Sequence, residues 1–410
     1  MRIAYLLLFL TFAACKKENK TSEDSGVVDS KTVTWTSDIS EALAKAKATG
    51  KLVFVECYSP TCPICQSIEP YFSTSEVATK YNSEFVNYKL DVGVAEQVKF
   101  LNDHNIWLPS FPQFLFFDGD GNLVHQAEVT PSTASIVAAA DEALSTDKRA
   151  SLYKSRFDAG ERDFDFLVKY GVYTRLVKDT LENLKVGEAL FATFDQNELG
   201  SETSWAVTKK VVTSVDNGFF KYWIDQMPKA AAYEKAQGHD GQELNTLGGI
   251  VQASIFRDGR KYSTQKIAVV KDYIRKVGGG DYADTYVWEQ ETLANLREGK
   301  PQVALNIGKS MAAKFANNGP SLVYIAKVFN DNFPNNSYLP VAKEWLSAAS
   351  NLVGEPAQQA EWHFEWARVH QKEGDLKNAS ERAKQAQKMA ETAGLDLKKF
   401  KNLVNTLRNV

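Results

Sequence analysis

The chain has 410 residues, 44% of them hydrophobic, with 48 basic and 51 acidic side chains and a formal net charge of −3. This length predicts two or three domains with well-filled cores, and the charge gives no positive field for nucleic acid, so we expect no nucleic-acid partner. Only four cysteines are present, which excludes a disulfide-rich scaffold.

The first fourteen residues have the pattern of a signal peptide. Met1 and Arg2 make a minimal basic start, and residues 3–14 carry no charge. Such a run is too short to span a bilayer, which takes about 20 residues. Residues 1–14 are therefore expected to direct export.

Residues 12–15 (Phe-Ala-Ala-Cys) resemble the lipobox of bacterial lipoproteins, with phenylalanine where leucine is usual. The resemblance implies cleavage before Cys15, attachment of lipid to its sulfur, and a chain held outside the cytoplasm at the cell envelope by that anchor alone. Lys16 after the cysteine favours the outer membrane. The alternative is an ordinary secretory signal with an incidental cysteine. Residues 15–31 are polar and charged and are expected to form a flexible tether.

Residues 32–148 alternate between strand-like and helix-like segments, as an α/β domain requires. Asp38 and Glu41 form a capping-box signature for a helix over residues 39–49, and Gly50 supplies its stop. The other expected elements are strands at 32–35, 52–58, 85–92, 114–117 and 123–129, and helices at 65–80, 95–104 and 132–144. We expect a mixed central sheet flanked by helices.

A dithiol stands where the strand at 52–58 leads into the next helix. Cys62 is the expected N-cap, and Pro63 is the first helical residue, where its missing N–H costs nothing. Free N–H groups and the dipole at a helix N-terminus stabilise a thiolate, the attacking species in thiol–disulfide exchange. Cys65 lies one turn further on the same face, so it can close a disulfide with Cys62. The spacing indicates redox chemistry.

Several positions around this dithiol resemble the thioredoxin superfamily. The Cys-Pro-Ile-Cys run at 62–65 is similar to its redox motif, Pro70 to the proline that kinks its active-site helix, and Glu56 to its buried acid. Residues 111–113 (Phe-Pro-Gln) resemble the segment whose cis-proline packs against the dithiol. The resemblance implies a thioredoxin-like fold for residues 32–148.

Three departures leave the redox potential and the substrate preference open. Thr61 stands where thioredoxins have tryptophan, and Pro63 and Ile64 replace their Gly-Pro dipeptide. The approach to Pro112 is two residues longer, which leaves Pro109 as an alternative for the cis position.

The resemblance also implies a role for each site residue. Cys62 attacks a substrate disulfide, and Cys65 resolves the mixed disulfide. Glu56 relays the proton that Cys65 must lose. An extended substrate would lie beside the cis-proline, which leaves neighbouring backbone groups free to bind it. The residues expected on this substrate-binding surface are Phe111, Pro112, Pro63 and Ile64.

Each of these assignments has an alternative. Cys62 and Cys65 could instead form a structural disulfide, and Glu56 could face water at a strand edge. A zinc site needs four ligands, and the chain has no second Cys-x-x-Cys and no close pair of histidines, so we expect neither a metal nor another cofactor. Cys57 is expected in the core, on the opposite side of the strand from Glu56.

From residue 149 onward, the apolar residues follow helical spacing. Three glycines at 278–280 suggest a joint between a helical region at 149–280 and a second one at 281–410. In the second region, Ala304, Ala342 and Ala379 recur with spacings of 38 and 37 residues. This pattern resembles tetratricopeptide-type repeats and implies a solenoid of helix pairs with a surface for a partner protein. The alternative is a helical domain without repeats.

The layout as a whole resembles exported bacterial thioredoxin-family proteins with long helical C-terminal extensions. It implies a membrane-anchored thiol–disulfide oxidoreductase that acts on thiols and disulfides of exported proteins and exchanges electrons with a further redox partner. The alternative is a protein-binding lipoprotein whose thioredoxin fold is a docking surface and whose disulfide is structural.

Overall fold

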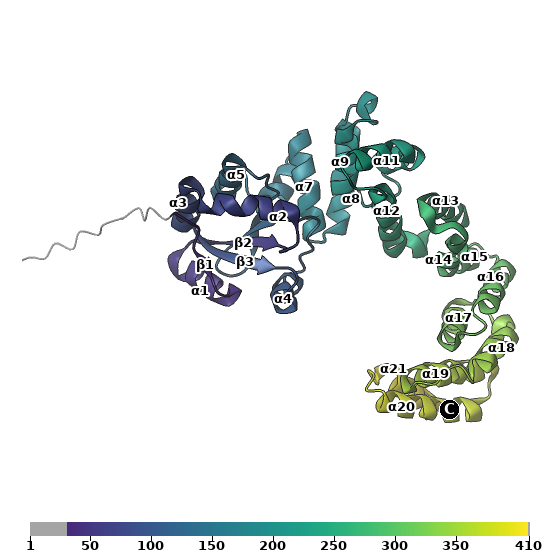
Figure 1. Cartoon of the computed structure of the whole chain (residues 1–410). Coiled ribbons are helices and arrows are strands. Elements are labelled where there is room, and N and C mark those ends of the chain that lie inside the picture. Colours follow the sequence, from purple (N-terminus) through teal and green to yellow (C-terminus); the bar gives the residue numbers. More distant parts are fainter. Residues whose placement is uncertain (1–30, 409–410) are drawn as a thin grey trace, which may run out of the picture. The chain divides into compact units, whose positions relative to one another are not determined.

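The computed structural model describes residues 31–408 (Figure 1). The expected signal peptide, Cys15 and the tether up to residue 30 lie outside the described residues. The chain divides into two compact units, one ending at Arg156 and the other beginning at Phe157. The first is an α/β unit and the second is helical, as the sequence predicts.

The α/β unit is built on a five-stranded mixed sheet with the strand order β1-β3-β2-β4-β5. Its strands are β1 (Trp35–Thr36), β2 (Leu52–Tyr58), β3 (Phe85–Asp91), β4 (Gln113–Phe117) and β5 (Leu123–Ala127). The central strand β2 pairs in parallel with β3 and antiparallel with β4, and β3 pairs in parallel with β1. Strand β1 begins three residues later than expected, and β5 ends two residues earlier. Residues 53–57 of β2 are fully buried because helices cover both faces of the sheet.

The expected helix over residues 39–49 is confirmed as α1 (Ile39–Thr49). The Asp38 side chain accepts the Glu41 N–H at 2.8 Å, which satisfies one of the free donors of the first turn. Gly50 ends the helix at φ 71°, a left-handed conformation that glycine adopts without strain.

The prediction of a single helix over residues 65–80 is wrong. The chain forms α2 (Pro63–Ile68), a 3₁₀ turn η1 (Glu69–Ser73) and a separate helix α3 (Ser75–Glu84). Pro70 has no N–H to continue the α-helical hydrogen-bond ladder, and Thr74 is extended at φ −88° and ψ 141°. The break lies directly after the helix that carries the two cysteines.

Helices α2, α3 and α5 (Thr133–Leu144) cover one face of the sheet. Their apolar side chains enclose a core with Phe54 on β2 and Phe114 on β4, whose ring centroids are 4.8 Å apart. Helix α4 (Ala95–Asp103) packs on the other face, where Phe100 meets the ring of Phe117. Side chains alternate along β2, so Phe54 and Glu56 share the first face while Cys57 points to the second.

Among its described residues, the second unit contains helices and their connections but no strand. Its helices, after α6 (Tyr153–Asp158) at the boundary, are α7 (Phe164–Leu176), α8 (Thr180–Thr193), α9 (Glu202–Val211), α10 (Gly218–Asp225), α11 (Met227–Ala236), α12 (Gln242–Asp258), α13 (Thr264–Ile274), α14 (Ala283–Tyr286), α15 (Trp288–Arg297), α16 (Pro301–Lys314), α17 (Gly319–Asn332), α18 (Leu339–Ala349), α19 (Pro356–Glu373), α20 (Leu376–Thr392) and α21 (Lys398–Arg408). Residues 275–279 close a short turn in which Gly278 has φ 91°.

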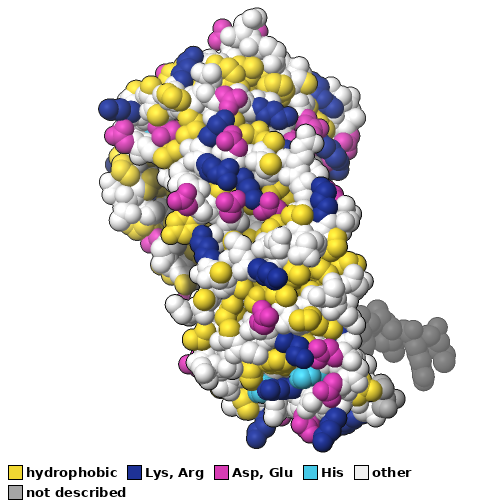
Figure 2. Space-filling model, turned by 90° about the vertical axis from the view of Figure 1, so that its right-hand side faces the viewer, with side chains coloured by type: hydrophobic (Ala, Val, Ile, Leu, Met, Phe, Trp, Pro, Cys, Tyr) yellow, Lys and Arg dark blue, Asp and Glu magenta, His cyan; other side chains and the backbone are white. Residues whose placement is uncertain are grey.

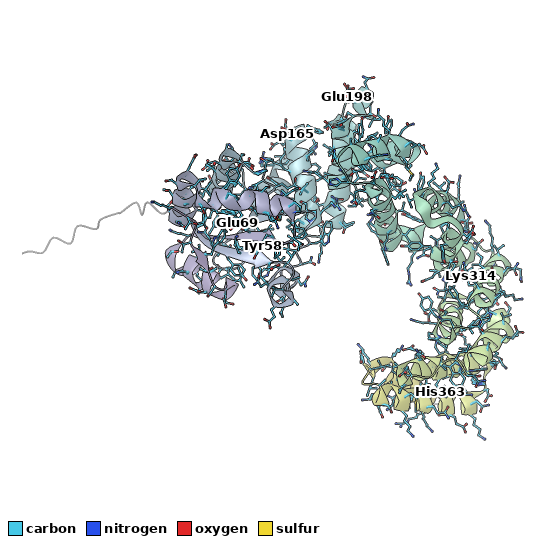
Figure 3. All side chains as sticks on the ribbon, viewed as in Figure 1. Tyr58, Glu69, Asp165, Glu198, Lys314 and His363 are labelled. Atoms are coloured by element: carbon cyan, nitrogen blue, oxygen red, sulfur yellow. The ribbon has the colours of Figure 1, made fainter. Side chains whose placement is uncertain are left out.

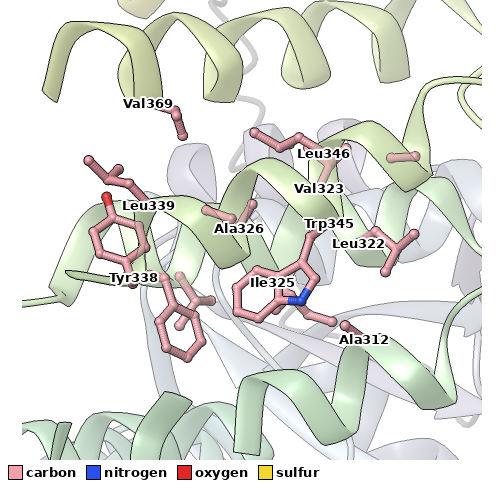
Figure 4. Close-up of a cluster of buried hydrophobic side chains, with 14 of the residues drawn as sticks. Ala312, Leu322, Val323, Ile325, Ala326, Tyr338, Leu339, Trp345, Leu346 and Val369 are labelled. Carbon is pink, nitrogen blue, oxygen red and sulfur yellow. The ribbon is translucent and has the colours of Figure 1, made fainter. Parts of the chain in front are cut away.

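The later helices associate in consecutive pairs: α15 with α16, α17 with α18, and α19 with α20. The small residues that recur in the sequence lie on the second helix of each pair, and Ala304, Ala342 and Ala379 are all fully buried. A small side chain at this position lets two helices approach closely. Figure 4 shows the core between α17, α18 and α19, where Trp345 lies among Leu322, Ala326 and Leu346.

Two surface properties bear on partners. Among residues 31–408, no helix has the length and apolar content needed to cross a bilayer. On the face drawn in Figure 2, basic and acidic side chains are interspersed with apolar ones. This mixture fits the near-balanced composition of the chain.

Candidate functional site

The two cysteines of the 62–65 run sit at the junction between β2 and α2. Cys62 is the N-cap of α2, with φ −81° and ψ 116°, and Pro63 is the first helical residue. The Cys62 N–H donates to the Ser59 carbonyl at 3.1 Å, and its own carbonyl accepts the Gln66 N–H at 3.1 Å. The local backbone therefore places a thiol at the N-terminus of the helix.

The two thiols differ in exposure. Cys62 is half-buried and Cys65 is only 4% exposed, and both are free thiols, as is Cys57. The Cys65 N–H donates to Cys62 Sγ at 3.4 Å, which favours negative charge on that sulfur. Burial raises the pKa of Cys65 to about 12, with smaller contributions in the same direction from its hydrogen bond to Cys62 and from the charge of Glu56. Cys65 therefore needs a nearby base before it can react.

Glu56 lies on β2, on the same face of the sheet as α2, and is 1% exposed. Neither of its carboxylate oxygens has a hydrogen-bond partner among the described residues. The Lys89 ammonium is 3.5 Å from Oε2. Burial raises the pKa of Glu56 to about 7; the charge of Lys89 opposes this rise and that of Glu69 adds to it. A carboxyl group that titrates near neutrality and influences Cys65 electrostatically has the properties of a proton acceptor.

Lys89 reaches Glu56 because β2 and β3 are in parallel register, with Glu56 opposite Lys89. Its ammonium also hydrogen-bonds to Glu69 at the start of η1. The rings of Trp35 and Tyr58 surround the cation, with centroids 5.2 Å and 5.1 Å from Nζ. Burial lowers the pKa of Lys89, but the carboxylates of Glu56 and Glu69 more than offset it, so the pKa is raised overall. The sticks of Tyr58 and Glu69 are labelled in Figure 3.

The cis-proline segment, the second expected part of the site, lies at the end of the sheet where β2 leads into the dithiol. The Phe111–Pro112 peptide bond is cis, and Pro109 has no cis bond. Strand β4 begins directly after Pro112, and its first residue, Gln113, pairs with Cys57 near the end of β2. Since β2 also leads into the dithiol, the strand connectivity brings the Phe111–Pro112 segment and Cys62 to one edge.

Comparison with known proteins bears on this domain. Residues 34–119 match a family model described as thioredoxin-like. The N-terminal unit carries a thioredoxin-like domain. The match covers about a fifth of the chain and includes β1 to β4, Glu56 and both cysteines of the 62–65 run. No curated protein matches the chain significantly.

Exposed apolar side chains occur in the segments of this thioredoxin-like domain that lead to the end of the sheet where the dithiol lies. Of the residues expected to contact substrate, Ile64 and Phe111 are 54% and 37% exposed, Pro63 is exposed, and Pro112 is buried. Val94, which follows β3, and Trp107, which precedes the cis peptide bond, are also exposed. The sequence reasoning missed both. The sequence signal that could have identified them is a large apolar side chain in a loop next to the strand ends where the dithiol lies.

The sequence reasoning also missed Lys89 and Glu69. Lys89 stands out as a charged residue within the otherwise largely apolar strand β3, but its contact with Glu56 depends on strand register. Glu69 is four residues after Cys65 and therefore on the same face of the active-site segment. With Glu56, these two side chains form a charged group next to the active-site segment.

Within the described part of the chain, no group of three or more His, Cys, Asp or Glu side chains is arranged to hold a metal ion. A cavity of about 860 Å³ opens at the β1 edge of the sheet. It is lined by residues such as Trp35, Asn82 and Asn87, and none of the cysteines lines it.

Proposed function

We propose that the thioredoxin-like domain is a thiol–disulfide oxidoreductase that works through Cys62 and Cys65. The observation that carries this proposal is the asymmetry of the pair. The half-buried Cys62 accepts an N–H at the N-terminus of α2, while Cys65 is buried behind it. Such asymmetry suits an attacking thiol and a resolving thiol.

The exchange involves two electrons and two protons. The Cys62 thiolate attacks one sulfur of a substrate disulfide, so a Cys62–substrate disulfide forms and the first substrate sulfur leaves as a thiolate. Cys65 then loses its proton and attacks Cys62 Sγ, which closes the Cys62–Cys65 disulfide and releases the second substrate sulfur. The substrate becomes a dithiol and the enzyme is oxidised. The reverse sequence oxidises a substrate dithiol.

Glu56 is proposed to accept the proton that Cys65 loses. Its carboxyl group is buried, titrates near pH 7 and acts electrostatically on Cys65. A base is most effective when its pKa lies close to the working pH. Glu56 therefore supports the resolving step.

The proposed substrates are extended segments of other proteins. Phe111 and Ile64 offer apolar contacts, and backbone groups beside Pro112 offer hydrogen bonds. The lipobox-like residues 12–15 support a place at the bacterial cell envelope, where the clients would be exported proteins. The helical unit is proposed to bind a client or the partner that returns the enzyme to its starting redox state.

The reduction potential of the Cys62–Cys65 pair tests the proposal. The full mature chain is equilibrated in glutathione and dithiothreitol redox buffers, and the oxidised fraction is measured by alkylation and mass spectrometry. We expect a midpoint at or above about −270 mV, as in dithiols that exchange electrons. A midpoint well below about −300 mV indicates a structural disulfide and favours the protein-binding alternative.

A Cys65→Ser variant provides a second test. Without the resolving thiol, the mixed disulfide between Cys62 and a substrate persists and can be isolated. The matched control is Cys62→Ser, which keeps Cys65 but removes the attacking thiol. Equal trapping by both variants contradicts the assigned roles.

A further inference from the structure

The charged group formed by Glu56, Lys89 and Glu69 contains one cation and two carboxylates. The Lys89 ammonium hydrogen-bonds to Glu69 and stands 3.5 Å from Glu56 Oε2 without a hydrogen bond to it. The Glu69 side chain is 54% exposed, whereas that of Glu56 is 1% exposed. The cation is thus engaged by the solvated carboxylate and only approaches the buried one.

Glu69 is tied to the active-site helix. Its backbone N–H donates to the Cys65 carbonyl at the end of α2. Aromatic rings of Trp35, Tyr58 and Phe72 surround the Lys89 ammonium on its other sides. The rings leave the two carboxylates as the groups that compete for the cation. The distance from Lys89 to Glu56 therefore depends on whether Glu69 also binds the ammonium.

We propose that Glu69 is a positioning residue for Glu56. By binding the Lys89 ammonium, Glu69 keeps this cation from pairing fully with Glu56, so that the buried carboxyl group is left able to exchange a proton with Cys65. Only this last step, the exchange with Cys65, rests on the proposed oxidoreductase function. The effect on Glu56 itself is a property of the folded domain.

Other ionisable groups lie close enough to Glu56 to feel its charge. Cys65 comes from α2, Tyr81 from α3, and Cys57 and Tyr58 from its own strand; each is influenced by the charge of Glu56. Burial raises the pKa of each of these four groups, so they stay neutral near pH 7. Burial is the largest influence on the ionisation of Glu56, and Lys89 and Glu69 are the charged side chains that oppose it and add to it at that pH.

The experiment is a titration of Glu56 in the reduced full-length chain by carbon-13 NMR of glutamate carboxyl groups, with Glu56→Gln to assign its signal. Glu69→Gln frees the Lys89 ammonium for Glu56 and removes a nearby negative charge. We expect it to move the Glu56 midpoint down by about 0.5 to 1 pH unit. Lys89→Met removes the cation and should move the midpoint up by a similar amount.

The matched control is Glu76→Gln, which neutralises an exposed acid in the first turn of α3 and should leave the midpoint unchanged. An unchanged or raised midpoint in Glu69→Gln overturns the proposal. The rate of disulfide exchange, measured over the same pH range, distinguishes the effect of Glu69 on Glu56 from the proposed oxidoreductase function. If no variant or wild-type chain exchanges disulfides but the midpoints shift as expected, the proposed function fails and the role of Glu69 on Glu56 stands.

Discussion

Both units bury glutamate side chains, and two of them, Glu56 in the first unit and Glu234 in the second, have opposite properties. Glu56 in the thioredoxin-like domain is 1% exposed and has no hydrogen-bond partner on either oxygen among the described residues. Glu234 on α11 is fully buried, but its Oε1 accepts hydrogen bonds from Trp205 Nε1 at 2.5 Å and from Lys209 Nζ at 2.6 Å. Each glutamate has a lysine beside it. The Lys89 ammonium is 3.5 Å from Glu56 Oε2, and the Lys209 ammonium is 2.6 Å from Glu234 Oε1.

The ionisation of the two side chains follows from these contacts. Burial raises the pKa of Glu56 to about 7, because the Lys89 charge only partly opposes it. Burial also pushes the pKa of Glu234 upward, but the hydrogen bonds from Lys209 and Trp205 outweigh it, so the pKa is lowered. Burial alone does not make a proton carrier. Glu234, whose Oε1 accepts two hydrogen bonds, stabilises the fold in its charged form. Glu56 has no hydrogen-bond partner on either oxygen among the described residues and remains available for proton exchange.

The largest expected effect concerns the dithiol, which only the first unit has. Cys62→Ser should lower the rate of disulfide exchange by about a thousandfold or more, because it removes the attacking sulfur. The measurement is the reduction of a small chromogenic disulfide by the reduced full-length chain. Cys57→Ala is the control, since Cys57 is buried on the opposite face of the sheet and should leave the rate nearly unchanged. A loss of rate in both variants contradicts the assignment of Cys62.

Replacing the buried base should have the next largest effect. Glu56→Gln keeps the side-chain volume but removes the proton acceptor, so we expect the resolving step to slow by about a hundredfold at pH 7. Stopped-flow detection of substrate thiol release would resolve this step. The loss should shrink as the pH rises toward the pKa of Cys65, about 12, because hydroxide then deprotonates Cys65 directly. A loss that is the same at every pH would indicate a structural effect.

The same substitution should stabilise the first unit. The pKa of Glu56 is about 7 in the folded chain against an ordinary value of 4.5, so the folded state binds the extra proton between these pH values. The penalty for burying the charge is absent below pH 4.5 and complete above pH 7. Glu56→Gln should therefore raise the free energy of unfolding at pH 8 by about 2–3 kcal/mol and change it little at pH 4. Calorimetry of the full chain at both pH values measures this difference.

Glu234→Gln should have the opposite sign in the helical unit. The lowered pKa of Glu234 means that its charged form stabilises the fold above its ordinary pKa, and this stability is lost as the pH falls through the folded pKa. We expect the variant to lower the free energy of unfolding by about 1–3 kcal/mol at pH 7, because Lys209 loses its charged partner. Calorimetry at pH 7 checks it. If Glu56→Gln and Glu234→Gln both stabilised the chain, the two glutamates would not differ as described.

The smallest expected effect concerns packing between the helix pairs. A Cβ on Gly308 of α16 would lie 2.6 Å from the Phe329 ring and 2.9 Å from Trp345. Gly308→Ala should therefore destabilise the helical unit by about 1–2 kcal/mol in urea unfolding, despite the better helix propensity of alanine. Gly249→Ala on α12 is the matched control. A Cβ there meets no atom within 4 Å, so this variant should be neutral or slightly stabilising.

Much of the fold could be predicted because its signals are local. The Asp38 cap and Gly50 define α1 within a dozen residues, and the buried run at 52–58 is β2 to the residue. The helical C-terminal region follows from apolar spacing, and its recurring alanines are buried as helix pairing requires. The prediction over residues 65–80 was wrong because the local sequence does not show whether a proline such as Pro70 kinks a helix or ends it.

The amino-acid sequence by itself determined that a dithiol stands at a helix N-terminus, because strand, turn, cap and Pro63 are contiguous in the chain. Only the tertiary structure decided which charges face it. Lys89 lies 33 residues beyond Glu56 and reaches it through the register of two parallel strands. The sequence around each residue does not show that Glu56 is left without hydrogen bonds while Glu234 Oε1 is paired. The ionisation of a buried carboxyl depends on its neighbours in space, and those neighbours are brought together by folding.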